Sequence, residues 1–141
     1  MFSKSNLIGT IVAAVWGFFG GGLLWGNLMD ATLQEHVVTA GLIKAEPDMV
    51  HLIIGCIVVA FCLANIYGKW ANGNYSIGSG LSFGVWIGVF TGLGLGLVNM
   101  ATLNFMDIAG TFIDAGINIV FLGIMGLLIG LVYSKTSSTA A

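Results

Sequence analysis

The chain has 141 residues, of which 57% are hydrophobic and only 7% are charged, with a formal net charge of -2. An ordinary soluble domain carries about 25% charged residues, so this composition excludes a soluble globular protein and indicates an integral membrane protein. The basic residues are four lysines scattered along the chain, which excludes a nucleic-acid-binding surface.

Four apolar segments are long enough to cross a bilayer, for which a helix needs about 20 residues. They predict an all-α fold: a single domain over residues 1–141, built as a polytopic, glycine-rich bundle of four transmembrane helices at residues 7–29, 50–67, 77–98 and 108–133. Lys4 followed by an apolar run also fits a signal peptide, but the run exceeds the roughly 7–15 residues of a signal h-region. We therefore expect an uncleaved first span. We also expect a short helix within residues 31–43 and a flexible tail at residues 134–141.

Small residues recur at every fourth position in two of these spans, and we call the two series glycine ladders. Small residues at this spacing let the backbone of a neighbouring helix approach closely, so each ladder predicts a helix-packing site. The matching spacing makes spans one and three natural partners, either within one subunit or between subunits. The span-one ladder is Gly9, Ala13, Gly17 and Gly21, and the span-three ladder is Gly80, Gly84, Gly88, Gly92 and Gly96.

The lysines predict the orientation of the chain. Lys4, Lys69 and Lys135 lie in the first tail, the second loop and the last tail, which share one side of a four-span protein. The positive-inside rule then places both termini in the cytoplasm, and we expect the bacterial inner membrane. The aromatic residues near the span ends should form belts at the two interfaces, with Trp25 on the outer side. The inner belt would consist of Tyr67, Trp70, Tyr75 and Tyr133.

Polar residues gather at the outer ends of the predicted spans. Asp114 lies within span four, and an ionisable residue in a span is a candidate functional site, for which we expect His51 as the partner. Acid and amide oxygens suit a hard cation or a proton. The alternative places Asp114 at headgroup level and uses Asn118 as a structural hydrogen bond between helices. The whole predicted cluster is Asn27, His51, Asn99, Asp107, Asp114 and Asn118.

The sequence contains no nucleophile–base pair, phosphate-binding loop or cofactor motif, so we expect neither an enzyme nor a bound cofactor. His36 and His51, combined with Glu35 or Asp48, match no spacing typical of zinc ligands, and we expect no metal site.

Three short motifs carry a resemblance to a known family. The first span ends in an aromatic-rich segment, and span three contains a tryptophan two residues before a glycine. Span four carries a six-residue segment with two polar residues ahead of a glycine-rich end. The residues are Leu24, Trp25, Gly26, Trp86, Gly88, Ile113, Asp114, Ala115, Gly116, Ile117 and Asn118. Over nearly its whole length the chain resembles the uncharacterised bacterial family "domain of unknown function 1761". That family has asparagine and histidine where this chain has Asp114 and Asn118. The resemblance implies a four-span fold and no particular activity.

The first hypothesis of function is a structural or accessory membrane subunit that self-associates, or joins a larger complex in the lipid bilayer, through its glycine ladders. The alternative is a small channel or transporter for a cation or proton that uses the polar cluster around Asp114. A third interpretation is a scaffold that holds a lipid or pigment in the grooves beside the ladders.

Overall fold

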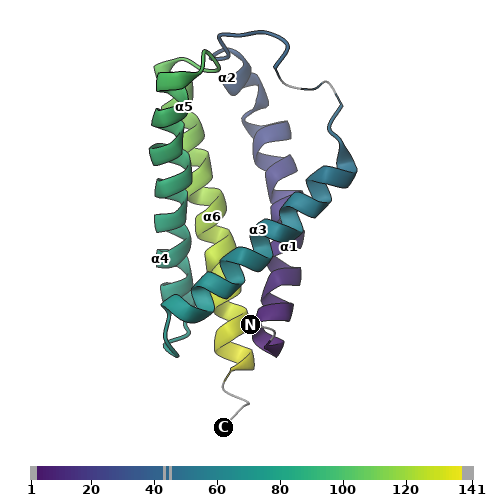
Figure 1. Ribbon diagram of the computed structural model, residues 1–141, viewed down its shortest axis with the longest axis vertical. Helices are drawn as coiled ribbons and strands as arrows, with labels where there is room; N and C mark the ends of the chain where they lie inside the picture. Colours follow the sequence, from purple (N-terminus) through teal and green to yellow (C-terminus); the bar gives the residue numbers. More distant parts are fainter. Residues whose placement is uncertain (1–2, 43, 45, 138–141) are drawn as a thin grey trace.

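The computed structural model describes residues 3–42, 44 and 46–137, and most of these residues are helical (Figure 1). The elements in chain order are α1 (Lys4–Leu23), the π-helix η1 (Leu24–Leu28), α2 (Asp30–Gln34), α3 (Met49–Trp70), α4 (Ile77–Gly88), the π-helix η2 (Val89–Leu95), α5 (Gly96–Thr102) and α6 (Ile108–Thr136). The described residues form no β-strand, only an isolated antiparallel bridge between Val37 and Met106.

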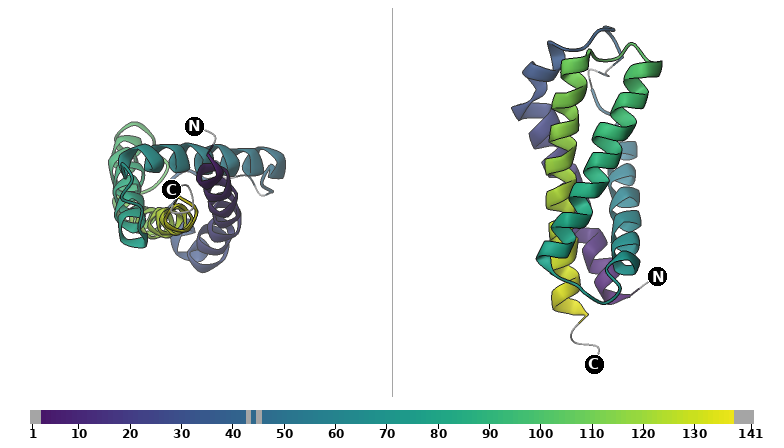
Figure 2. Two further views of the ribbon diagram at one scale, coloured as in Figure 1. Left: turned by 90° about the horizontal axis from the view of Figure 1, so that it is seen from below. Right: turned by 90° about the vertical axis from the view of Figure 1, so that its left-hand side faces the viewer.

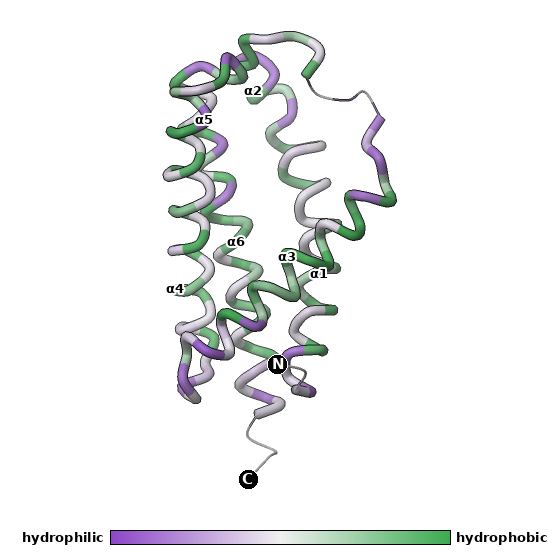
Figure 3. Tube along the Cα trace, in the orientation of Figure 1, coloured by the Kyte–Doolittle hydropathy of each residue, from purple (hydrophilic) through white to green (hydrophobic). Residues whose placement is uncertain are grey.

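Four helical segments are long and apolar enough to cross a membrane, namely Lys4–Leu28, Met49–Trp70, Ile77–Thr102 and Ile108–Thr136. Figure 3 shows hydrophobic residues along these segments and hydrophilic residues gathered mainly at the turns. The all-α, four-helix prediction is therefore confirmed, and the architecture is compatible with a small integral membrane protein. Of the tail predicted at residues 134–141, the part up to Thr136 belongs to α6, which corrects the prediction there; residues 138–141 lie outside the described residues. The helix expected within residues 31–43 is only the five-residue α2.

Each long helix begins at a serine or aspartate that caps its first turn. The side chains of Ser3, Asp48 and Asp107 each accept a hydrogen bond from the backbone N–H three residues further on. At the start of α4, Ser76 and Ser79 form a capping box. These caps satisfy backbone donors that have no partner inside the helix, and they set where each span begins.

The helices are arranged around α6. α4 and η2 pack along one side of α6 and α1 along another, while α3 crosses α1 obliquely at the edge of the bundle (Figures 1 and 2). In the most apolar window of α6, 44% of the residues are buried, against 17% in α3, so α6 is the core helix. The prediction that spans one and three pack on each other is wrong within one chain, because span one lies against α3 and α6 and span three lies against α6.

The start of α1 and the end of α6 meet at one end of the bundle, which we call the termini end. There the Thr136 hydroxyl donates to Ser5 Oγ at 2.7 Å. The core lies close by, around the fully buried Tyr67, which makes an edge-to-face contact with Tyr133 at 5.4 Å. The Tyr133 hydroxyl donates to the Ala64 carbonyl at 2.8 Å. Tyr67 and Tyr133 were expected in the inner interfacial belt; both are instead buried in the core, where their hydroxyls have protein partners.

At the opposite end, which we call the loop end, the segment after α2 and the turn before α6 are joined. The backbone N–H of Val38 donates to the Phe105 carbonyl at 2.9 Å, and that of Asp107 donates to the His36 carbonyl at 3.0 Å. The segment after α2 is therefore held against the turn before α6.

Candidate functional site

The span-three ladder is filled by α6 of the same chain. A Cβ added to Gly88 would lie 2.6 Å from the Ile119 Cα, and one added to Gly92 would lie 2.9 Å from the Ala115 carbonyl oxygen. Gly80 and Gly84 are tighter still, since their added Cβ atoms would overlap carbonyl oxygens of α6. At the loop end, the added Cβ of Gly96 would lie 3.5 Å from the Thr111 methyl. This ladder thus sets a close backbone contact inside one chain.

The span-one ladder is filled over only part of its length. Gly9 faces Tyr133 and Ala64, Ala13 is fully buried, and Gly17 faces Cys56 and Met125. Gly21, the last member, has none of the described neighbouring atoms within 4 Å of an added Cβ, and Gly22 and Gly26 are equally open. The glycine-rich face of α1 therefore changes from closed to open between Gly17 and Gly21.

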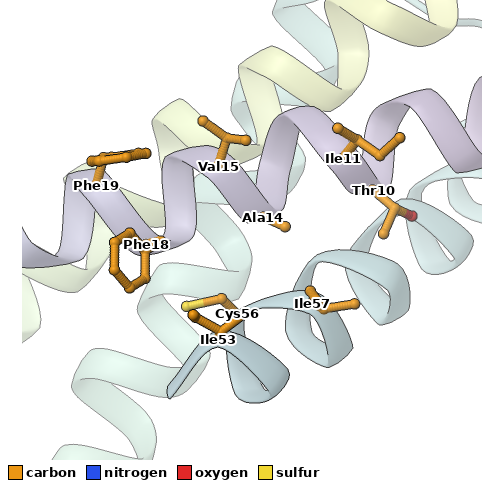
Figure 4. A pocket seen from close by; sticks show the side chains of 9 residues that line it. All are labelled: Thr10, Ile11, Ala14, Val15, Phe18, Phe19, Ile53, Cys56 and Ile57. Carbon is orange, nitrogen blue, oxygen red and sulfur yellow. The ribbon is translucent and has the colours of Figure 1, made fainter. Parts of the chain in front are cut away.

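A series of three neighbouring cavities runs from the contact between α1 and α3 to the loop that follows α2. A groove of about 410 Å³ is formed by side chains of α1 and α3 that are apolar except for Thr10 and Cys56; Figure 4 shows Ala14 and Phe18 of α1 opposite Ile53 and Cys56 of α3. The groove shares Phe18 and Phe19 with a cleft of about 960 Å³. The other residues that line this cleft are Gly17, Gly21, Gly22, Leu23, Trp25, Gly26, Asn27, Asp30, Lys44, Pro47, Met49 and Leu52.

The cleft shares Asp30 and Lys44 with a third cavity of about 480 Å³ beneath the loop that follows α2. This third cavity has a mixed lining that includes Gln34 and Thr39. The lining of the series therefore changes from apolar to polar towards the loop end. Acidic Asp30 and basic Lys44 lie where the second and third cavities meet.

Asp114 lies half-buried in α6 and has two neutral hydrogen-bond donors. The indole Nε1 of Trp25 donates to Asp114 Oδ1 at 2.7 Å, and Nδ2 of Asn118 donates to Asp114 Oδ2 at 3.0 Å. Trp25 also makes an edge-to-face contact with Phe121, with ring centroids 5.1 Å apart. Asp114 thus joins η1 to α6.

The predicted polar cluster does not assemble as a whole. Asn118 contacts Asp114, and Asn99 lines a cavity of about 80 Å³ together with Asp114 and Thr111. His51 is not the partner of Asp114, since its Nδ1 lies 2.7 Å from Asp48 Oδ2 at the start of α3. Asn27 donates to the Gly22 carbonyl, 3.0 Å away.

Asp107 has a structural partner in each of two elements. Its Oδ1 accepts from the Gly110 N–H at 2.7 Å, and its Oδ2 lies 2.9 Å from His36 Nδ1. The Gly110 N–H, followed by the bond to His36, holds the pKa of the Asp107 carboxyl below its ordinary value. In the same way, hydrogen bonds from the side chain and the backbone of His51 lower the pKa of Asp48. These two carboxylates stabilise helix starts at the loop end.

Sequence reasoning missed Trp25 as the partner of Asp114 and His36 as the partner of Asp107. The two members of each pair are 89 and 71 residues apart, and no local spacing connects them. Among the residues that the structure describes, no three His, Cys, Asp or Glu side chains are grouped so as to hold a metal ion.

Comparison of the chain with protein-family models, with curated proteins and with solved structures finds no match in any of the three. The resemblance to the family of unknown function stays a prediction, and the function is argued from the geometry alone.

Proposed function

We propose that this small integral membrane protein has an accessory, non-catalytic role, and that it binds a phospholipid-like amphiphile between α1 and α3. The observation that carries the proposal is the series of three adjacent cavities that share lining residues, apolar at one end and polar at the other. An amphiphile has the same order, with its chain at one end and its head group at the other.

The size and lining of the cleft fit such a ligand. Small-molecule sites measure roughly 300–1,000 Å³, are mostly apolar with a few polar groups, and occur between the helices of bundles. The cleft, at about 960 Å³, is lined by Phe18, Phe19 and Leu23 and has the open glycines as its floor. Since none of the described side chains fills the space above Gly21 and Gly22, a chain from outside the protein can lie there.

The polar end of the series favours a head group that carries both charges. The Lys44 ammonium suits a phosphate, and the Asp30 carboxylate suits an amine. Asp30 also accepts from Gln34 Nε2 at 2.9 and 3.0 Å, which holds the carboxylate in place. We therefore propose a zwitterionic phospholipid with a phosphate and an ammonium group.

The distribution of lysines supports an orientation with both termini in the cytoplasm, in the inner membrane of a bacterium. The loop end, with Asp30 and Lys44, is then the outer side. The head group of the proposed ligand lies in the outer leaflet under this arrangement.

The test is native mass spectrometry of the protein purified in mild detergent and incubated with phosphatidylethanolamine. Wild type should retain one lipid. Gly22→Leu should lose it, because Gly22 lines the cleft and a Cβ added there has none of the described neighbouring atoms within 4 Å, so the new side chain occupies the space of the ligand. Gly116→Leu is the matched control, since Gly116 on α6 is equally open but lies outside the cleft. Equal retention by wild type and Gly22→Leu, or no lipid on wild type, would contradict the proposal.

A second candidate function, association with another subunit, rests on one further observation. The first half of α3 is uncovered: of residues 49–59 only Cys56 is not exposed. Together with the open glycines of α1, it offers a face that a transmembrane helix of a second copy or another subunit would cover. The span-three ladder is unavailable for this role because α6 fills it.

Disulfide trapping in native membranes separates the two candidates. In a Cys56→Ala, Cys62→Ala background, association predicts crosslinked species through Gly22→Cys and none through Gly116→Cys. A lipid-filled cleft predicts none through either position.

A cation or proton pathway has less support. α6 between Ile119 and Val132 consists only of apolar residues and glycine, so the polar surface around Asp114 does not continue along this helix towards the termini end.

A further inference from the structure

In the part of the chain that the structure describes, the carboxylate of Asp114 has hydrogen-bond donors but no counter-charge. Its donors are the neutral Trp25 indole and the neutral Asn118 amide, and the ion pairs within the described residues involve only Asp48 and Asp107, each with a histidine. A carboxylate oxygen accepts more than one bond, so both oxygens keep the capacity to bind a further ligand. A half-buried negative charge with only neutral neighbours is costly unless a cation or a proton balances it.

A small cavity borders this carboxylate between α5 and α6. It measures about 80 Å³, and its polar lining residues are Asn99, Thr111 and Asp114. The apolar side chains of Met100, Phe105 and Met106 line the remainder, together with Gly96. Since a water molecule takes about 30 Å³, the cavity has room for a small ion with one or two waters.

The oxygens around the cavity are suited to accepting. The Thr111 hydroxyl donates its proton to the Asp107 carbonyl at 2.9 Å, so towards any further ligand it can only accept. Asn99 adds an amide, whose oxygen is a second neutral ligand. Carboxylate, hydroxyl and amide oxygens, completed by water, are the ligands of hard cations.

The charge of the site selects a monovalent ion. Protein sites for divalent calcium use several carboxylates, whereas this cavity has one. A monovalent cation neutralises the Asp114 carboxylate, whereas a divalent cation would leave the half-buried site with a net positive charge. The geometry points to a sodium-type site at Asp114, Thr111 and Asn99. Trp25 lines the proposed lipid cleft and donates to Asp114, so the two sites are neighbours, but the three proposed ion ligands do not line the cleft.

The test is thermal unfolding of the detergent-purified protein at constant ionic strength in sodium, potassium or choline chloride. A ligand that binds only the folded state raises its stability as the ligand concentration passes the dissociation constant. We expect a saturable rise of about 3 °C or more in sodium relative to choline for wild type. Asp114→Asn and Thr111→Val should abolish that rise, and Glu35→Gln, which removes an exposed carboxylate outside both proposed sites, should keep it.

Equilibrium binding of radioactive sodium to the same samples gives a second readout, with about one ion per chain expected for wild type and none for Thr111→Val. Equal stability of wild type in all three salts would overturn the inference, as would sodium-dependent stabilisation that survives in Asp114→Asn. If wild-type stability instead follows pH in choline, is indifferent to sodium, and loses its pH dependence in Asp114→Asn, the site takes a proton and the sodium assignment is wrong. The wild-type salt comparison decides even where Asp114→Asn does not fold.

Discussion

The two glycine ladders have the same spacing but opposite outcomes. The span-three ladder packs on α6 from Gly80 to Gly96. The span-one ladder packs on α3 and α6 only as far as Gly17, after which α1 and α3 diverge around a cleft. The extent of packing therefore depends on the helix that faces each ladder, and not on the spacing of the ladder itself.

The partner of span three carries small residues of its own. Added Cβ atoms on Gly126 and Gly130 of α6 would come within 3 Å of the backbone of α4, so glycine meets glycine there. On α3, small residues follow the same four-residue spacing from Ala64 through Ala60 to Cys56, and Leu52 then ends the series. A ladder therefore permits close approach, and the facing residues decide whether it occurs.

The largest expected effect comes from breaking the closed ladder. In Gly84→Ala the new Cβ would overlap the Leu122 carbonyl oxygen, which belongs to backbone and cannot rotate away. α4 and α6 must then separate, and we expect the free energy of unfolding to fall by about 3 kcal/mol. Gly22→Ala and Gly116→Ala, at open positions, should change it by less than about 1 kcal/mol. Denaturant titration of the three variants in mixed micelles measures this; similar losses in all three would show that the tight and open faces do not differ.

A smaller effect is expected where α1, α3 and α6 meet at the termini end. Tyr133→Phe removes the hydroxyl that donates to the Ala64 carbonyl and accepts from Asn6 Nδ2 at 3.4 Å. The loss should be about 1–2 kcal/mol, since a buried amide partner loses its acceptor. The same titration applies, with Tyr75→Phe as the control, because the half-buried Tyr75 hydroxyl donates within its own turn to Gly68. If Tyr75→Phe lowers the free energy of unfolding as much as Tyr133→Phe does, the hydrogen bonds of Tyr133 to Ala64 and Asn6 have no special share in stability.

The smallest effect concerns the exposed link between the loops. The Asp107 pKa is lowered in the folded protein, so its contribution to stability is fully present above the unfolded pKa of about 4 and is lost as pH falls through the folded pKa. Asp107→Asn keeps a capping side chain but no titration, and its melting temperature should fall less than that of wild type between pH 5 and pH 3. Parallel curves would exclude Asp107 as a source of the acid sensitivity.

The helices were predictable from the sequence, and most of their partners were not. Runs of apolar residues bounded by Ser3, Asp48, Ser76 and Asp107 place each span within a few residues, because length and capping are local properties. Pairing within a bilayer has no such local cause, since lipid and protein are equally apolar and packing fit decides. We predicted the two regular ladders as partners because their spacing matches. The α6 glycines that fit span three, Gly123, Gly126 and Gly130, follow a less regular spacing.

The candidate site shows the same limit. Asp114 was identified because an acid in an apolar span is conspicuous, and Asn118, one turn away, came with it. His51 was chosen as its partner from the expected level in the membrane, yet the capping bond to Asp48 is local and keeps His51 at the start of α3. The cleft depends on where α3 leaves α1, with Met49 and Leu52 of α3 lining it across from the open glycines, and no local sequence pattern specifies that point.

The π-helix η2 has a consequence for how long two helices stay in phase. In an α-helix four residues turn slightly more than one full circle, so a strict four-residue ladder rotates gradually around the helix axis. A π-helix closes its bonds five residues apart and has more than four residues per turn, so the same spacing there rotates in the opposite sense. Gly80, Gly84 and Gly88 lie in or next to α4, and Gly92 lies in η2. The change of helix type returns the ladder to the α6 side before it drifts away, which lets one continuous glycine face follow its neighbour over the whole thickness of the bundle.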